Sequence, residues 1–393
     1  MLYLQDSMTD RTSMSEEERL SPVNTWPGSG VERLIAQDSL YATQLHETVD
    51  QDCETFLQRM LQEEHFSGVA LVKNGAEVVH AKGYGNANAG EKNHVGTTLH
   101  VASITKQFTA AAILQLVEAG KVALDRSINE YLPEKYRSPQ WQCVNCSHLL
   151  SHSSGIDDYA VVRDYYNVVD GFCLGDTVDG MIREATAKPL RFEPGSKFEY
   201  SNIGFTLLGE ILEYQTSTAY DAYIETRVLQ PLGMNSSRVH VIGHVPAEIE
   251  ASGYRWDVAS RRHVKDDIVS LPVTAPDGGL TTNLSDFIKW TTIYTAMEPK
   301  VLSRNSIKQM TTPRVLTGLQ DARGGALGYG FGLFVGEGLL SHPGYIVGFR
   351  SHFILDTTRD LLVAVFSNNT SNDPQRIAHG LLKIADAKIM DKF

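Results

Sequence analysis

The sequence lacks the features that mark membrane-spanning and secreted proteins. Its 393 residues contain no apolar run that approaches the ~18 residues of a membrane span. Residues 1–20 are polar and acidic, without the basic and then apolar order of a secretion signal. We therefore expect a cytoplasmic protein that does not bind a membrane.

Basic clusters are also missing. The formal net charge is -12 and the sequence pI is about 5.5. This balance argues against nucleic acid and anionic lipid surfaces as partners. The excess acid keeps the chain soluble or favours a cationic substrate, and solubility is the simpler explanation.

Cysteine is scarce, with Cys53, Cys143, Cys146 and Cys173 only. Four cysteines are too few to staple a chain of this size, and they are not spaced as a disulfide framework. Cys143-Val-Asn-Cys146 followed by His148 resembles half a zinc site, but no second cysteine pair follows. We interpret these residues as ordinary thiols and expect no metal ion or other cofactor.

Over residues 1–82, the sequence pattern changes from a polar segment to a helical one and then to two strands. Residues 1–38 are rich in polar residues and proline without a period, which predicts a disordered tail. Apolar residues then follow helical spacing from about 41 to 61. Residues 67–73 and 76–82 predict two strands, and Asn74-Gly75 predicts the hairpin turn between them.

Strand patterns return near the C-terminus, and no internal repeat is found. We predict an α+β fold, an α/β sandwich, in which both termini build one antiparallel sheet flanked by terminal helices, with a large mainly helical region inserted. The site is expected in the cleft between the two parts. The predicted C-terminal strands are 338–343, 349–355 and 360–366, the last helix is 375–390, and the domain is 39–393, with sheet parts 39–100 and 330–393 and a helical part 101–329.

The first chemical motif is the stretch Val101-Ala-Ser-Ile-Thr-Lys106. Ser103 lies three residues before Lys106, in the first turn of a helix expected to end at Gly120, so both side chains share one helix face. Serine needs a neighbour that removes its proton, and lysine does this only if burial or another cation lowers its pKa. The alternative is a serine that caps a helix, followed by a solvated lysine.

The second motif is Tyr200-Ser201-Asn202, which precedes a helical pattern over 205–212. In an extended loop, Tyr200 and Asn202 point the same way and offer a phenol for proton transfer and an amide for a substrate carbonyl or a lysine. The alternative is that Ser201 or Asn202 only caps the next helix.

The third motif is His342-Pro343-Gly344-Tyr345, on or just after a strand. Gly344 permits close approach of a substrate, and backbone N–H groups here and at Ser103 supply the donor pair that an oxyanion requires. A purely structural histidine is the alternative.

In this order, the three motifs resemble those of the serine β-lactamase and DD-peptidase superfamily: Ser-x-x-Lys, Ser/Tyr-x-Asn and a Lys/His triplet that ends in Gly. The tyrosine version is similar to the class C β-lactamase-related branch. The likeness covers about residues 64–385 and includes scaffold blocks at 118–125, 149–156 and 275–280. Within the second block, His152 is expected to tie loop backbone together.

This resemblance implies a role for each motif residue. Ser103 attacks the substrate carbonyl, Lys106 and Tyr200 share proton transfer, and Asn202 holds Lys106 and the substrate. Which of Lys106 and Tyr200 is the base stays open. The backbone N–H groups of Ser103 and Tyr345 form the oxyanion hole, and His342 and Gly344 contact the substrate.

The resemblance also implies a serine hydrolase that cleaves an amide or ester of a small molecule or short peptide through an acyl-enzyme on Ser103. Acyl transfer from the same intermediate and an inactive binding or scaffolding homologue are the alternatives. Class C β-lactamases have lysine where this chain has His342, so we do not expect efficient β-lactamase activity. His342 supplies a positive charge at mildly acidic pH or one hydrogen bond when neutral. Substrate identity and oligomeric state are not predicted.

Overall fold

A computed structural model describes residues 30–158, 168–169, 172–173, 178–240, 250–266 and 275–389. The chain divides into two compact units, Met1–His46 and Glu47–Phe393, and the second unit contains all candidate site residues. Helix α1 (Gly30–Glu64) begins earlier than the pattern from residue 41 predicted. Residues 1–29 of the predicted tail lie outside the described part of the chain.

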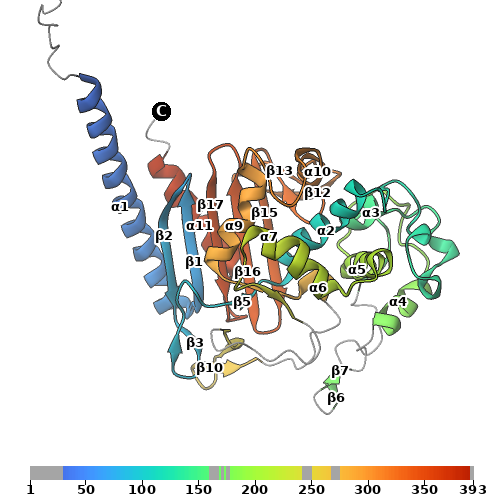
Figure 1. Ribbon diagram of the computed structural model, residues 1–393. Coiled ribbons are helices and arrows are strands. Elements are labelled where there is room, and N and C mark those ends of the chain that lie inside the picture. The colour runs from blue at the N-terminus through green and yellow to red at the C-terminus, as the bar shows by residue number, and fades with distance from the viewer. Residues whose placement is uncertain are drawn as a thin grey trace, which may run out of the picture. The chain divides into compact units, whose positions relative to one another are not determined.

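An eight-stranded antiparallel sheet forms the centre of the second unit (Figure 1), and its strand order is β12-β13-β14-β15-β16-β17-β1-β2. The hairpin β1–β2 turns at Gly75, whose φ of +57° suits glycine. Strand β1 pairs with β17, so both ends of the chain build one sheet, as predicted. The strands are β1 (Gly68–Asn74), β2 (Glu77–Tyr84), β12 (Val315–Gln320), β13 (Ala326–Tyr329), β14 (Phe334–Val335), β15 (Leu339–Ile346), β16 (Phe349–Asp356) and β17 (Leu361–Ser367).

Three of these strands were not predicted. Strands β12, β13 and β14 are short or largely exposed, and glycines interrupt the segment that contains them. Apolar and polar residues therefore alternate too weakly in these segments to predict strands from the sequence. Strands β12 and β13 extend the sheet to residues before 330.

Successive residues of β1 point to opposite faces of the sheet and are buried in two different clusters. Ala70 and Val72 pack with the C-terminal part of α1 and with α11 (Pro374–Ile389). Val69 and Leu71 belong to the main core, which includes α2 (Lys106–Glu118) and α9 (Leu284–Thr295). Both faces of the sheet are thus covered by helices, which confirms the predicted fold class (Figure 1).

The inserted region between β2 and β12 is mainly helical and also contains short strands. A three-stranded sheet β5-β11-β8 leads into the turn that holds Ser103. Its strands are β5 (Leu99–His100), β8 (Arg238–Val239) and β11 (Leu280–Thr282). The other principal helices are α3 (Cys146–Leu150), α4 (Val178–Thr186), α5 (Asn202–Thr216), α6 (Tyr220–Ile224), α7 (Gln230–Leu232), α8 (Ala275–Gly278) and α10 (Arg304–Met310).

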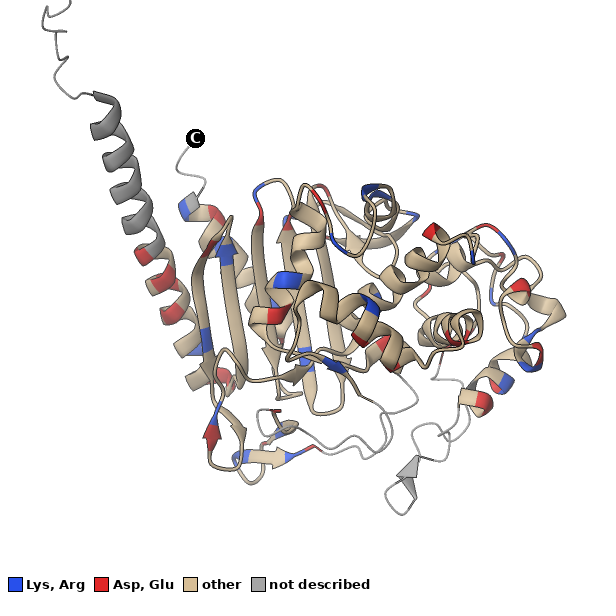
Figure 2. Cartoon of the chain, in the orientation of Figure 1, with Lys and Arg blue, Asp and Glu red and all other residues tan. Residues whose placement is uncertain are grey.

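Acidic and basic residues are interspersed over the described elements rather than separated by sign (Figure 2). Among the helices of the described ranges, none combines the length and the apolar character that a membrane span requires.

Candidate active site

Ser103 lies in the 3-10 turn Ala102–Thr105 that connects strand β5 to helix α2. Ala102 has a φ of +50°, a left-handed conformation that is costly for a residue with a side chain. Two contacts hold the preceding residue in place: Val101 N donates to Leu280 O at 3.1 Å, and Ser351 Oγ donates to Val101 O at 2.7 Å. The nucleophile candidate is therefore presented by a turn that its neighbours fix.

Lys106 is completely buried, and its ammonium group lies beside Ser103. Its Nζ atom donates to Ser103 Oγ at 3.0 Å, Asn202 Oδ1 at 2.8 Å and the Asp277 backbone oxygen at 2.9 Å. Burial lowers the pKa of Lys106 to about 8, although the negative charges of Asp277 and Asp158 act in the opposite direction. The alternative that Lys106 is a solvent-exposed lysine does not fit the structure, because Lys106 is fully buried.

Tyr200 stands in the loop before helix α5, with its phenol beside the Ser103 hydroxyl. The Lys106 Nζ atom lies 4.9 Å from the centre of the Tyr200 ring. Burial raises the pKa of the Tyr200 phenol well above its usual value, although the nearby Ser103 hydroxyl acts in the opposite direction. The phenol is thus protonated at neutral pH, while a fraction of Lys106 is neutral there.

Asn202 begins helix α5, and Ser201 is the N-cap, because its hydroxyl accepts a hydrogen bond from Gly204 N. Asp158 orients the Asn202 side chain: its carboxylate accepts from Asn202 Nδ2 at 3.2 Å and from Asn202 N at 2.7 Å. The sequence analysis missed Asp158, although it closely follows the recognised scaffold block at 149–156.

Asp277 is a second missed residue. It lies in the block 275–280, which the sequence analysis assigned to scaffold, and its backbone oxygen accepts from Lys106. One of its carboxylate oxygens is 3.9 Å from Lys106 Nζ. Asp277 is 4% exposed, so its charge acts on the lysine with little screening.

His342 is fully buried on strand β15, close to Tyr200, with ring centroids 6.3 Å apart. Its Nε2 accepts from the Tyr329 hydroxyl at 2.9 Å and its Nδ1–H donates to Pro343 O at 2.5 Å. Burial, and then the charge of Lys106, lowers the pKa of His342 to about 3. The positive charge predicted at mildly acidic pH does not fit the structure. The hydrogen bond of the neutral ring goes to Pro343 O and not to a substrate, as in the alternative of a purely structural histidine.

Gly344 lies against the turn that holds Ser103. A Cβ atom at this position would be 2.1 Å from Ser351 Oγ and 2.3 Å from Val101 O. The neighbouring Tyr345 side chain is 63% exposed, and the Arg350 guanidinium stacks on its ring at 4.8 Å. Glycine at 344 is therefore a packing requirement of the nucleophile turn.

Replacing Gly344 with alanine is expected to lower the free energy of unfolding by about 2 kcal/mol, because the new methyl group must displace Val101 and Ser351. Hydrolysis of a reporter ester should fall at least about tenfold, since Val101 leads into Ser103. The control is Gly96→Ala, whose methyl group would meet only the ring of the exposed His94 at 3.2 Å. Unchanged stability and activity in Gly344→Ala would contradict this packing argument.

Two further motif residues have structural partners. His152 Nδ1 accepts from Ser201 N at 3.1 Å, which confirms that His152 ties the loop backbone. Asn145 caps helix α3 in a reciprocal pair with His148. Cys146 is buried in that helix, and burial raises the pKa of its thiol to about 12. In the structure, the segment from Asn145 to His148 forms the N-terminus of helix α3.

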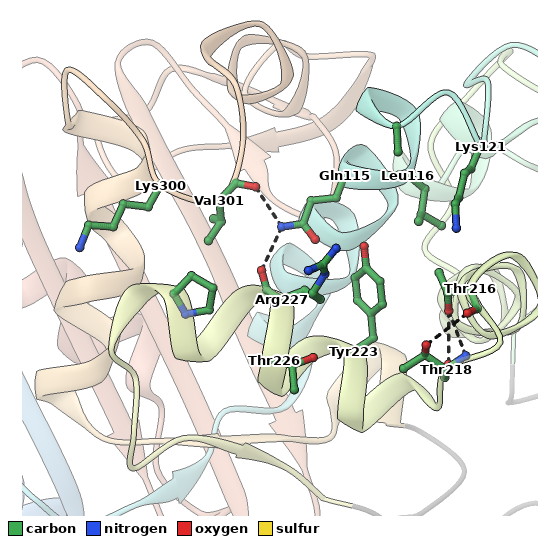
Figure 3. Close-up of a pocket in the computed structure, with 12 residues that line it drawn as sticks. Gln115, Leu116, Lys121, Thr216, Thr218, Tyr223, Thr226, Arg227, Lys300 and Val301 are labelled. Carbon is green, nitrogen blue, oxygen red and sulfur yellow. Dashed lines mark hydrogen bonds between the residues drawn. The ribbon is translucent and has the colours of Figure 1, made fainter.

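A separate hollow of about 540 Å³ lies at the C-terminal end of helix α2 (Figure 3). Gln115 Nε2 donates there to the backbone oxygens of Arg227 at 3.1 Å and Val301 at 2.9 Å. Lys121 and Lys300 lie on opposite sides of the view. The residues that line this hollow do not include Ser103, Lys106 or Tyr200. This hollow is therefore separate from the candidate active site.

Comparison with known proteins agrees with this geometry. The chain is 27% identical over 354 residues to penicillin-binding protein 4* of Bacillus subtilis, covering 85% of this chain and 74% of that protein. It is 32% identical over 206 residues to esterase EstB of Burkholderia gladioli, and the match covers 50% of this chain and 51% of the esterase. The solved octameric penicillin-binding protein homologue from Pyrococcus abyssi superposes with a TM-score of 0.75 at 29% identity, covering 86% and 77%.

The family model for beta-lactamase matches residues 54–387, which include all three motifs. Ser103, Lys106, Tyr200 and Asn202, predicted from separate motifs, lie together in the structure. The chain belongs to the beta-lactamase family of serine hydrolases.

Proposed function

We propose that this protein cleaves an amide or ester bond of a small or peptide-like substrate through an acyl-enzyme on Ser103. The observation that carries the proposal is the contact of 3.0 Å between Ser103 Oγ and Lys106 Nζ, together with the lowered pKa of that buried lysine. A lysine with a pKa of about 8 is neutral in a useful fraction of molecules at physiological pH.

In the proposed reaction, Ser103 Oγ attacks the carbonyl carbon while its proton moves to neutral Lys106 Nζ. The carbonyl oxygen becomes an oxyanion, which the backbone N–H groups of Ser103 and Tyr345 stabilise. Lys106 returns the proton to the leaving amine or alcohol by way of the Tyr200 hydroxyl, and the acyl-enzyme forms. Water then attacks the acyl carbon and gives its proton to Lys106. The bond from the acyl carbon to Ser103 Oγ breaks, Ser103 Oγ takes the proton back from Lys106, and the acid product leaves.

Asn202 is proposed to hold Lys106 with its side-chain oxygen and to orient the substrate. The close approach at Gly344, which the sequence suggested for a substrate, is made by the turn that holds Ser103. His342 is proposed to shape this edge of the site as a neutral ring, because both of its nitrogens bond within the protein.

The pH dependence of kcat/KM should identify the base. If Lys106 is the base, activity rises with pH as Lys106 loses its proton and levels off above its pKa of about 8. His342 adds no change between pH 5 and 8, because its pKa is about 3. If the Tyr200 phenolate is the base, activity should keep rising beyond pH 10. The measurement is a pH–rate profile with an ester that is stable to alkali.

Replacing Asp158 with asparagine should reduce kcat by about 10- to 100-fold, because the new amide can present a donor to Asn202 Nδ2 and so misplace Asn202. Loss of the Asp158 charge should also move the alkaline rise in activity to lower pH, since this charge raises the pKa of Lys106. Asp157→Asn is the matched control, because Asp157 pairs with Arg191 instead. A purely structural Asp158 would leave the midpoint of the pH profile unchanged.

The substrate class is the next question. His342 replaces the lysine of class C β-lactamases, and its neutral ring offers no charge for a drug carboxylate. We therefore expect poor turnover of cephalosporins. The cytoplasmic location stays a prediction.

The proposal is tested with the purified protein and a panel of chromogenic substrates: p-nitrophenyl butyrate, D- and L-aminoacyl p-nitroanilides and a cephalosporin. Cleavage that depends on Ser103 supports the proposal, and the rank order of rates names the bond and side-chain preference. An added alcohol that diverts product from acid to ester would favour acyl transfer. No cleavage and no covalent labelling of Ser103 would favour the inactive homologue.

A further inference from the structure

We propose that His100, His240 and Glu250 form a binding site for one divalent cation, with Zn²⁺ as the best-matched ion. The three residues are far apart in the sequence but meet beside the small sheet β5-β11-β8. One nitrogen or oxygen atom from each residue lies within 4.8 Å of the others. His100 Nε2 and Glu250 Oε1 are 3.5 Å apart.

Backbone pairing places the three residues together. His100 ends β5 opposite Thr281 of β11, and His240 directly follows β8, which pairs with the other edge of β11. Glu250 enters through a parallel bridge to Thr98, and Ala251 N donates to Thr98 O at 2.9 Å. His240 N donates to Gly279 O at 2.6 Å. The backbone of the site is thus fixed independently of any ion.

The chemistry of the donor atoms selects the class of ion. Two imidazoles and one carboxylate, with a fourth position for water, are a zinc ligand set, whereas Ca²⁺ and Mg²⁺ prefer oxygen ligands alone. Ligand atoms of a tetrahedral zinc site are about 3.4 Å apart, given metal–ligand distances of about 2.1 Å. The His100–Glu250 separation already matches this value, and the His240 nitrogen, within 4.8 Å of both partners, would have to move closer when the ion binds.

Burial makes the cluster more than a chance grouping on the surface. His100 is 5% exposed and Glu250 is 7% exposed, while His240 is partly exposed and leaves a path for the ion. The ring centroids of His100 and His240 are 4.8 Å apart, and the ring centroid of Phe349 is 5.0 Å from that of His100. A buried carboxylate is stabilised by nearby positive charge, which a bound cation would supply.

The ion would act on structure rather than on the proposed hydrolysis. His100 is three residues before Ser103 and belongs to the strand that leads into its turn. A bound ion would tie this strand to the segments at 240 and 250. Zinc should therefore raise the melting temperature of the metal-free protein. This inference does not depend on the proposed substrate, and its test does not use activity.

The test uses the full-length protein freed of metal with a chelator. Titration of Zn²⁺ against a chromogenic zinc chelator should give one ion per chain, and the melting temperature should rise with added zinc. Co²⁺ should give the visible spectrum of a tetrahedral site without a thiolate charge-transfer band. Glu250→Gln and His240→Ala should each weaken zinc binding at least about tenfold.

Two control variants separate this site from other zinc ligands. Cys143→Ser removes the exposed thiol of the Cys143/Cys146 segment, and His94→Ala removes an exposed histidine. Both should bind zinc as the unmodified protein does. Absence of stoichiometric binding, binding lost only in Cys143→Ser, or unchanged binding in His240→Ala would overturn the proposal and leave a His100–Glu250 ion pair. If Glu250→Gln does not fold, His240→Ala and the Co²⁺ spectrum decide.

Discussion

Ser103→Ala is expected to lower kcat for every substrate that the protein cleaves by a factor of about 10⁴ or more, because no other group takes the place of the attacking oxygen. Stability should change little, since the side chain is partly exposed and alanine suits its turn. Steady-state kinetics with the best substrate of the panel, together with a thermal melt, measures both effects.

The control for this variant is Ser196→Ala, in an exposed loop, which should retain full activity. A Ser103→Ala protein that keeps more than a few per cent of the rate would show that another group attacks the substrate. The proposed acyl-enzyme would then be wrong.

Lys106→Met is expected to reduce kcat/KM by about 10³-fold, within the range that one general base contributes. Methionine fills the same buried space but removes the proton acceptor beside Ser103 Oγ. It also leaves Asn202 Oδ1 and Asp277 O without the donor that now satisfies them. The residual activity should no longer rise as the pH passes about 8, which is the pKa of Lys106.

Lys73→Met is the matched control, because Lys73 is also a buried lysine and its partner is Asp360, outside the site. It should lose stability without losing the alkaline rise in activity. If Lys106→Met retained that rise, the base would be another group, with Tyr200 as the first candidate.

Local sequence signals predicted much of the fold. Asn74-Gly75 predicted the turn of β1–β2, and alternating apolar residues predicted β15, β16 and β17. The pairing of β1 with β17 could be inferred because both are apolar strands at opposite ends of a long insertion. Strands β12 to β14 could not be predicted, since their residues are half-exposed or lie among glycines and lack a clear period.

Only those residues of the candidate site that lie in motifs with a fixed spacing were predicted from the sequence. Ser103, Lys106, Tyr200 and Asn202 lie in such motifs, and the structure brings them together. The sequence could not show which of the neighbouring residues Asp157 and Asp158 belongs to the site. Only the structure distinguishes them, because Asp157 pairs with Lys188 and Arg191. His100, His240 and Glu250 are far apart in the sequence, and they are found together only through the pairing of β5, β11 and β8 and the bridge from Glu250 to Thr98.

The most direct test of the acyl-enzyme is intact-protein mass spectrometry after brief exposure to a fluorophosphonate probe, followed by peptide mapping. We predict one adduct per chain, located on Ser103, absent from Ser103→Ala and formed much more slowly by Lys106→Met. A full-length protein that takes up no probe, or takes it up equally well as Ser103→Ala, would contradict the assignment of Ser103 as the nucleophile.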